Sequence, residues 1–269
     1  DGAWYLRAYD DDGRAVGSAH SPPPHIDSIS QSWAILSGAG DARRDDQALA
    51  AAERMLVRDS DRLVLLLAPP FGPHGPDPGY IAAYPPGVRE NGGQYTHAAA
   101  WLGWAHAARG DGETAHRIAG LLNPLERTRT PAEVARYRVE PYVLAGDVYA
   151  GPWAGRGGWT WYTGAAAWTW RLILEEILGV RRRRGALEVE PCIPRAWDGF
   201  DAWIRAGQLT VHVIVRNPEH VARGIAAVSL DGQPVERARV ELAGTGERIL
   251  EIQLGTSERG RGNCTGSVV

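Results

Sequence analysis

The spacing of apolar positions changes once along the chain, near residue 180. Before that point, apolar residues recur at helical spacing, as in Leu49, Ala52 and Leu56. After it, stretches such as QLTVHVIVRNP and RILEIQL alternate apolar and polar residues, which is typical of strands with one buried face. The pattern therefore predicts a mainly α fold, with a helical region over 1–180, a small antiparallel β domain over 185–255 and a disordered tail over 256–269.

Several segments of the first region read as helices with recognisable ends. Asp27 is a good N-cap for a helix over 27–37, and Gly179 is a suitable stop for the last helix. The other expected helices are 45–57, 97–109, 113–122 and 159–178, with a short segment capped by Thr130. LVLLL at 63–67 reads as a short buried run, and the Pro- and Gly-rich loop over 68–87 is long enough to be functional.

Composition excludes some functions and leaves others open. The 269 residues carry a formal net charge of -3, which gives no indication of nucleic-acid or anionic-membrane binding. Two cysteines, Cys192 and Cys264, make neither a disulfide framework nor a metal cluster, and we expect Cys192 to be unpaired. The longest apolar run, Leu63 to Ala68, is too short to cross a bilayer, and no signal peptide is recognisable. Because the chain starts at Asp1 inside a folded-looking pattern, we expect it to be a C-terminal piece of a longer protein.

Two charged clusters have ordinary structural interpretations. Asp10, Asp11 and Asp12 precede a glycine, and we interpret them as a solvated turn rather than a metal site. Arg181 to Arg184 follow the last predicted helix, and we interpret them as its basic C-terminus rather than an anion patch.

The aromatic composition is skewed toward rings with a polar edge, which suits carbohydrate binding. Eleven tryptophans and nine tyrosines stand against two phenylalanines. Such rings are stacking platforms for sugars, although many of them also serve as ordinary core.

Candidate chemistry is concentrated at two predicted helix starts. In YPPGVRENGGQYTHAAAW (84–101), a polar loop with Arg89 and Glu90 leads into a helix with His97 in its first turn. A helix N-terminus presents unpaired N–H groups to an anion, and His97 could add a donor or could simply be a core histidine. A second glycine-preceded, aromatic-flanked start lies at Gly158–Gly164, and we predict that the two starts meet in space.

Several of these stretches together resemble glycoside hydrolase family 94. They are WYLRAYDDDG, IDSISQSWAILSG, YPPGVRENGGQYTHAAAW, EPYVLAGDVY and GRGGWTWYTGAAAW. The family contains inverting phosphorylases, and the likeness extends to the phosphorylase-like region of cyclic β-1,2-glucan synthases. The resemblance implies that the chain holds the second half of an (α/α)6 barrel followed by a small β domain. It also implies a location in the cytoplasm or in the soluble part of an inner-membrane glucan synthase.

The resemblance also implies a reaction and a set of binding residues. Inorganic phosphate would be the co-substrate, with no cofactor and no metal, and a β-glucan oligosaccharide would be the other partner. Phosphate-binding positions fall on His97, Thr163 and Gly164. Sugar-binding positions are Arg89, Glu90, Tyr95 and Trp161.

The family's general acid lies in a motif that this chain lacks, so no catalytic residue is assigned within it. The acid would come from an N-terminal part of the same polypeptide, without which the fragment would be inactive, and a homodimer is possible. The alternatives are a non-catalytic carbohydrate-binding or structural module and a water-using α/α-barrel hydrolase. For the hydrolase, Glu90, Glu140 and Asp147 are the carboxylates available.

Overall fold

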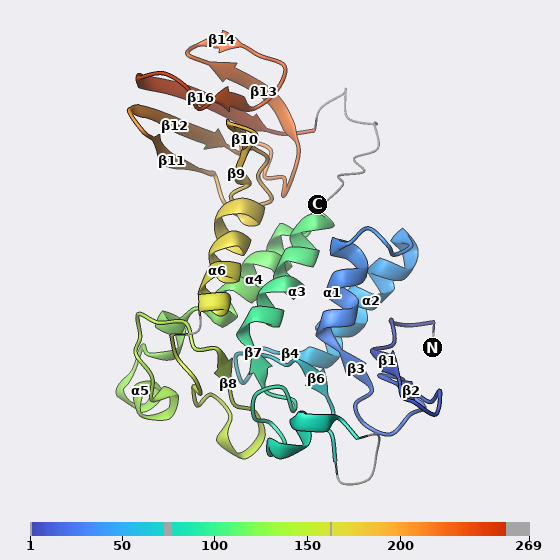
Figure 1. Cartoon of the computed structure of the whole chain (residues 1–269). Helices are drawn as coiled ribbons and strands as arrows, with labels where there is room; N and C mark the ends of the chain where they lie inside the picture. Colours follow the sequence, from blue (N-terminus) through green and yellow to red (C-terminus); the bar gives the residue numbers. More distant parts are fainter. Residues whose placement is uncertain (1, 73–76, 162, 257–269) are drawn as a thin grey trace. The chain divides into compact units, whose positions relative to one another are not determined.

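A computed structural model describes residues 2–72, 77–161 and 163–256, which form two compact units (Figure 1). The first unit comprises residues 2–108 and 117–172 and carries most of the helices. The second comprises 109–116 and 173–256 and carries two β-sheets. The predicted order of helices followed by a β region is confirmed. The fold as a whole is mixed α and β rather than mainly α, because strands pair throughout the second unit and also in the loops of the first.

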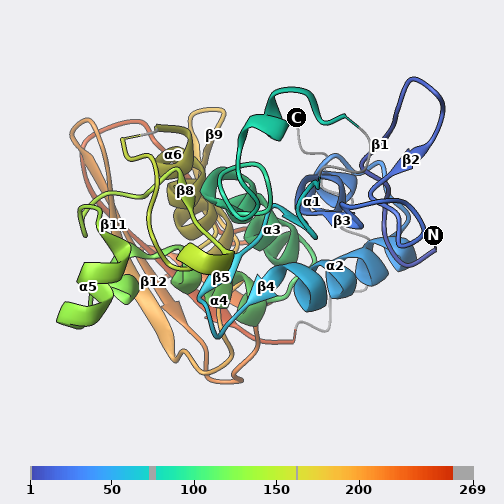
Figure 2. The same cartoon turned by 90° about the horizontal axis from the view of Figure 1, so that it is seen from below.

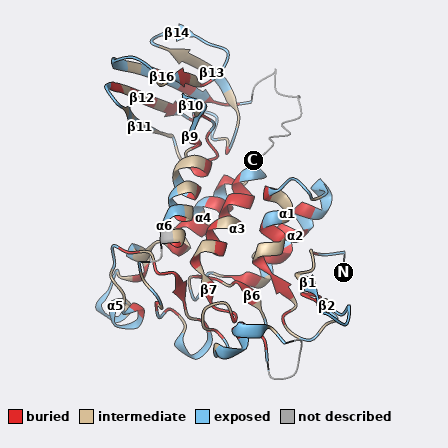
Figure 3. Ribbon diagram, viewed as in Figure 1, coloured by how far each residue is buried: buried red, intermediate tan, exposed pale blue. Residues whose placement is uncertain are grey.

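Three helices form a packed row in the first unit. In both views α3 (Thr96–Ala108) lies between α1 (Ser28–Leu36) and α6 (Thr163–Arg171), and it contacts both (Figures 1 and 2). α3 is buried along nearly its whole length, as Figure 3 shows. Gly103 allows the side chain of Leu172 to pack closely against α3, because a Cβ at position 103 would lie only 2.8 Å from it. The half-barrel itself stays a prediction.

The remaining helical elements are short or flank this row. They are α2 (Ala42–Leu56), α4 (Gly112–Leu122), α5 (Pro131–Tyr137), the 3₁₀ turns η1 (Gly79–Ala83), η2 (Pro124–Arg127) and η3 (Gly151–Trp153), and the π-helical turn η4 (Leu172–Ile177).

Capping residues determine where several of the helices begin. The Asp27 carboxylate accepts the N–H groups of Ile29 at 2.8 Å and Ser30 at 3.2 Å, so α1 begins where the sequence predicts. Helix α2 begins three residues earlier than predicted, because Asp41 rather than a later residue is its N-cap. Thr130 caps α5 with a reciprocal capping box, in agreement with the prediction for that segment.

The last helix of the first unit was predicted to start too early. Trp159 is not helical, because its N–H and C=O groups bond to Asp147 and Gly146 instead. Trp161 has a φ of 64°, which is incompatible with a right-handed helix. The helix continues from α6 into the π-helical turn η4 and stops before Gly179, whose φ is 69°.

Two-residue strands tie the loops of the first unit together. The pairs are β1 (Ala8–Tyr9) with β2 (Ala15–Val16), β3 (Ile26–Asp27) with β6 (Leu67–Ala68), β4 (Val57–Arg58) with β5 (Leu63–Val64), and β7 (Gln94–Tyr95) with β8 (Asp147–Val148). The turn between β1 and β2 holds Asp10, whose carboxylate accepts the N–H groups of Asp12 and Arg14. This confirms the interpretation of the aspartates as a turn.

The second unit contains a three-stranded and a five-stranded sheet. The first has the order β15 (Arg239–Glu241), β10 (Ala186–Val189), β9 (Val180–Arg183). The second has the order β11 (Gly199–Ala206), β12 (Leu209–Arg216), β16 (Gly246–Leu254), β13 (Ile225–Leu230), β14 (Gln233–Pro234). The expected turn at Asp231 and Gly232 is confirmed, since both have positive φ between β13 and β14.

The second sheet is not purely antiparallel, so that part of the prediction was wrong. β16 pairs antiparallel with β13 but parallel with β12. Between β14 and β16 the chain contributes β15 to the other sheet, and this detour lets it return in the same direction as β12. The alternation of apolar and polar residues in the sequence is the same for parallel and antiparallel strands, so it could not reveal this pairing.

The interpretation of Arg181 to Arg184 as a helix C-terminus was also wrong. Val180–Arg183 form strand β9 rather than a helix terminus, and Arg181 pairs with Glu176 at 2.8 Å and Glu190 at 3.6 Å. Cys192 is a buried free thiol, while Cys264 and the predicted tail beyond Thr256 lie outside the described residues. Over the part of the chain that the structure describes, no helix has the length and apolar character needed to span a membrane.

Candidate functional site

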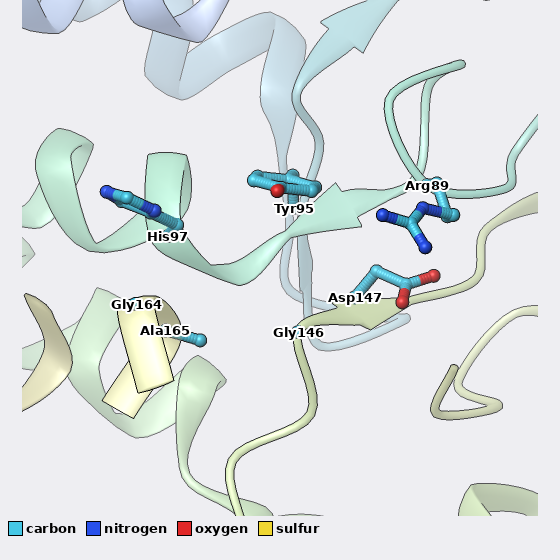
Figure 4. A pocket seen from close by; sticks show the side chains of 7 residues that line it. All are labelled: Arg89, Tyr95, His97, Gly146, Asp147, Gly164 and Ala165. Carbon is cyan, nitrogen blue, oxygen red and sulfur yellow. The ribbon is translucent and has the colours of Figure 1, made fainter. Parts of the chain in front are cut away.

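A cavity of about 70 Å³ lies in the first unit, where its loops meet the starts of α3 and α6 (Figure 4). This volume is several times that needed for a single water molecule. It is lined by Arg89, Tyr95, His97, Gly146, Asp147, Gly164 and Ala165.

Backbone pairing between distant segments builds the walls of the cavity. Tyr95 of β7 lies opposite Asp147 of β8, and the N–H of Thr96 donates to Gly146 at 3.0 Å. On the other side of β8, the N–H of Gly146 donates to Trp159 at 2.6 Å. The segments around 89–97 and 158–164 therefore meet across β8, as predicted, although they are far apart in the sequence.

His97 projects from the first turn of α3 toward the start of α6. A Cβ at Gly164 would lie 3.2 Å from its Nδ1, so a side chain at this position would crowd the ring. The imidazole stacks on Trp168 at 5.5 Å and meets Trp101 edge-on at 4.3 Å between ring centroids. Its Nε2 is buried and has no hydrogen-bond partner in the part of the chain that the structure describes. Burial lowers the pKa of His97 below its usual value, which favours the neutral ring at neutral pH.

Asp147 lies at the other end of the cavity and is only 1% exposed. Its Oδ1 accepts the N–H of Trp159 at 2.9 Å, while its Oδ2 is buried and has no hydrogen-bond partner among the residues that the structure describes. Burial raises the pKa of this carboxyl, and the nearby Arg89 partly opposes the rise. A Cβ at Gly158 would lie 2.4 Å from the carboxylate, so the carboxylate can occupy this place only because residue 158 is glycine.

Arg89 supplies the positive charge of the site. Its φ is 48°, and its guanidinium bonds Glu90 at 3.3 Å. The same group lies over the rings of Tyr84 at 5.2 Å and Trp159 at 5.3 Å. The loop that holds it is fixed by Asn91, a buried amide.

The structure brings together some of the residues singled out in the sequence and leaves others apart. Arg89, Tyr95, His97 and Gly164 line the cavity. Glu90 pairs with Arg89 but is not a lining residue.

Two further sequence candidates are not placed in the cavity. Trp161 is 70% exposed, is not among the lining residues, and donates from Nε1 to Glu140 at 3.4 Å. The side chain of Thr163 lies outside what the structure describes.

Three lining residues were absent from the predicted site. Gly146 and Ala165 carry no side-chain signal, since both are small residues in apolar stretches. Asp147 was considered only as a carboxylate for a hydrolase. The available signal was a single charge inside the apolar run VLAGDVYA.

The site does not offer a metal centre among the described residues. No group of three or more His, Cys, Asp or Glu side chains lies close enough to hold an ion in the described ranges. The polar groups instead suit an anion at one end and hydroxyl groups at the other.

The sequence of the chain is similar to those of a glucan synthase and of several phosphorylases. Its sequence is 46% identical over 230 residues to the cyclic beta-(1,2)-glucan synthase NdvB of Rhizobium meliloti (strain 1021), which covers 85% of the chain and 8% of that protein. It is 30% identical over 256 residues to the N,N'-diacetylchitobiose phosphorylase of Vibrio proteolyticus, covering 94% of the chain and 31% of the relative. It is 29% identical to a 3-O-beta-D-glucopyranosyl-beta-D-glucuronide phosphorylase of Paenibacillus borealis, covering 94% and 33%.

The chain thus spans at most about a third of the length of these three relatives. Residues 1–179 match the catalytic domain of the glycosyl hydrolase 94 superfamily, and this match includes every residue that lines the cavity. The chain therefore belongs to the glycosyl hydrolase 94 superfamily.

Proposed function

We propose that this chain is part of an enzyme that makes or cleaves β-glucosidic bonds by inverting phosphorolysis. In cleavage, a phosphate oxygen bonds to the anomeric carbon as the bond from that carbon to the leaving sugar oxygen breaks. A carboxylic acid protonates the leaving oxygen, and the products are a sugar 1-phosphate and a shortened glucan. Phosphate is already an anionic nucleophile, so a binding site for it replaces the base that a hydrolase needs.

The observation that carries this proposal is the position of His97 against the start of α6. A half-buried imidazole, whose Nε2 has no hydrogen-bond partner among the described residues, and the N-terminal backbone of a helix are donors suited to phosphate. In this proposal His97, Thr163 and Gly164 bind phosphate, and Arg89, Glu90, Tyr95 and Trp161 belong to the sugar-binding side. The general acid comes from sequence upstream of this chain, so the chain alone lacks phosphorolysis.

One relative supports a particular substrate class. The similarity to a cyclic β-1,2-glucan synthase supports a β-1,2-linked glucan, whereas the names of the other two relatives give other substrates. We therefore propose β-1,2-glucan oligosaccharides as substrates, with phosphate as co-substrate and no cofactor.

The proposal is tested with a protein that contains this chain together with its upstream sequence. Release of sugar 1-phosphate from β-1,2- and β-1,4-glucan oligomers is measured across a phosphate titration. His97→Ala is expected to weaken phosphate use about ten- to a hundredfold, since a hydrogen bond to a charged group contributes about 1.5–3 kcal/mol. Thr163→Ala is expected to act in the same direction but more weakly, because its neutral hydroxyl is the lesser donor.

His106→Gln is the matched control, because His106 is a buried histidine on the same helix that does not line the cavity. Wild-type phosphate dependence in His97→Ala would identify His97 as a core histidine. Glucan cleavage that proceeds without phosphate would favour a water-using hydrolase, and glucan binding with no cleavage would favour a binding module.

A further inference from the structure

The two ends of the cavity differ in charge. Figure 4 shows His97 beside Gly164 and Ala165 at one end, the ring of Tyr95 in the middle, and Arg89 with Asp147 at the other end. The first end offers donors to an anion. The second end contains a carboxylate that would repel an anion.

One oxygen of the Asp147 carboxylate lacks a close hydrogen-bond partner among the described residues. Oδ1 accepts the N–H of Trp159, and the backbone of Arg89 also acts on the carboxyl, whereas Oδ2 is buried and accepts no close hydrogen bond from the part of the chain that the structure describes. A buried acceptor without a partner destabilises the fold, and its most direct compensation is a ligand that donates to it.

The surrounding charges define what kind of donor fits. Arg89 is the cation that acts on Asp147, but its guanidinium also holds Glu90. Arg89 lowers the pKa of the Asp147 carboxyl and Glu90 raises it, so Glu90 offsets the positive charge of Arg89 at this end of the cavity. This balance disfavours an anionic ligand and favours the neutral hydroxyl groups of a sugar.

We propose that Oδ2 of Asp147 accepts a hydrogen bond from a hydroxyl group of the glucan substrate and so contributes to sugar specificity. Its Oδ1 bond to Trp159 meanwhile holds the segment that leads into α6, so the carboxylate is fixed before substrate arrives. This proposal adds a residue to the sugar side of the site and rests on the proposed function for the reaction it serves.

Asp147→Asn tests the proposal, because its amide oxygen can keep the bond to Trp159 while an NH₂ group replaces Oδ2. In the protein with its upstream sequence, KM for β-1,2-glucan oligomers is expected to rise about ten- to a hundredfold. KM for phosphate and the melting temperature are expected to stay near wild type. Asp45→Asn is the matched control, since Asp45 is a buried carboxylate that accepts the hydroxyl of Tyr5 and does not line the cavity.

A series of monodeoxy glucose acceptors, used in the synthetic direction, identifies the hydroxyl. For one deoxy acceptor, turnover by the wild-type enzyme should fall about as much as Asp147→Asn lowers turnover of the unmodified acceptor. The Asp147→Asn variant should lose no further turnover with that deoxy acceptor. The proposal would be overturned if every deoxy acceptor lowered turnover by the same factor in the variant as in the wild type. An unchanged KM for the sugar in the variant would overturn it as well. If Asp147→Asn does not fold, a wild-type enzyme that tolerates every deoxy acceptor would overturn it as well.

The outcome can be separated from failure of the proposed function. If the wild-type protein shows no phosphorolysis, calorimetric binding of β-1,2-glucan oligomers replaces turnover. Weaker binding by Asp147→Asn than by wild type would then support the role of Asp147 while the phosphorolytic reaction is rejected. Equal binding would overturn it.

Discussion

The helical unit and the five-stranded sheet are built from different kinds of interior. Buried polar side chains such as Gln31, Asn91, Gln94 and Asp147 lie in the helical unit, where they bond to backbone groups. The inner face of the five-stranded sheet is aliphatic instead. It is formed by Leu209, Val211, Val213 and Val215 of β12 and by Leu250, Ile252 and Leu254 of β16.

The two kinds of interior serve different purposes, since the aliphatic one stabilises the fold and the polar one can bind a ligand. Apolar burial stabilises the sheet without directional requirements, whereas each buried polar group must be matched by a partner. Around the cavity, His97 Nε2 and Asp147 Oδ2 find no such partner among the described residues. The helical unit thus tolerates a destabilising arrangement at the place where a ligand would compensate for it.

The largest expected effect is on the stability of the sheet. Leu250→Ala should lower the free energy of unfolding by about 2–5 kcal/mol, because it leaves a cavity at a fully buried position. Denaturant titration followed by circular dichroism measures the loss. Ile249→Ala is the control, since Ile249 precedes Leu250 in β16 but is 39% exposed. An equal loss in both variants would contradict the assignment of the buried face.

The next effect falls on the cavity wall. Gly158→Ala would place a Cβ within 2.4 Å of the Asp147 carboxylate, and we expect it to cost about 1–3 kcal/mol of stability and to reduce sugar binding. Thermal melting and glucan calorimetry measure both. In Gly120→Ala the new Cβ meets nothing within 4 Å in helix α4, so that control should be neutral or stabilising by up to about 1 kcal/mol. Unchanged melting and binding in Gly158→Ala would show that the wall is not tight.

A smaller effect concerns pH. Burial lowers the pKa of His97 below its ordinary 6.5, so between the two values the unfolded chain holds more protons than the folded one. The His97 contribution to stability is therefore present above pH 6.5 and is lost as pH falls through this window. Melting curves from pH 7.5 to pH 5 should show a shallower loss for His97→Gln than for wild type. Identical slopes would mean that His97 is not desolvated.

The smallest effect is expected at the turn between β1 and β2. Arg14 pairs with Asp12 at 3.0 Å, but the two side chains are 75% and 68% exposed. Arg14→Ala should change the free energy of unfolding by less than about 0.5 kcal/mol and leave glucan cleavage unchanged. A clear loss of activity would reopen the question of whether the aspartate cluster is functional.

The sequence predicted local structure well where a single residue determines it. Asp27 and Thr130 as caps and Gly179 as a stop each act within one turn of the chain, so their effect is legible from neighbours alone. The start of α6 was misjudged because Trp159 bonds to residues about twelve positions away. The direction of β16 was missed for the same reason, since it depends on a partner strand chosen in three dimensions.

For the site, too, local features could be predicted and long-range ones could not. The approach of His97 to Gly164 could be predicted because both belong to helix starts with matching features. Asp147 could not be assigned, because its place depends on the pairing of β7 with β8 and on the missing side chain of Gly158. A lone aspartate in an apolar run indicates that something unusual is buried there, but not which cavity it faces.

The central position of β16 has a consequence for how this chain matures on the ribosome. β16 lies between β12 and β13 and pairs with both, yet it is the last strand of the sheet to be synthesised. Until residue 254 has left the exit tunnel, β12 and β13 each have an open edge that can pair with other nascent chains. Truncated products ending before Gly246 should therefore be more prone to aggregate than those ending after Leu254.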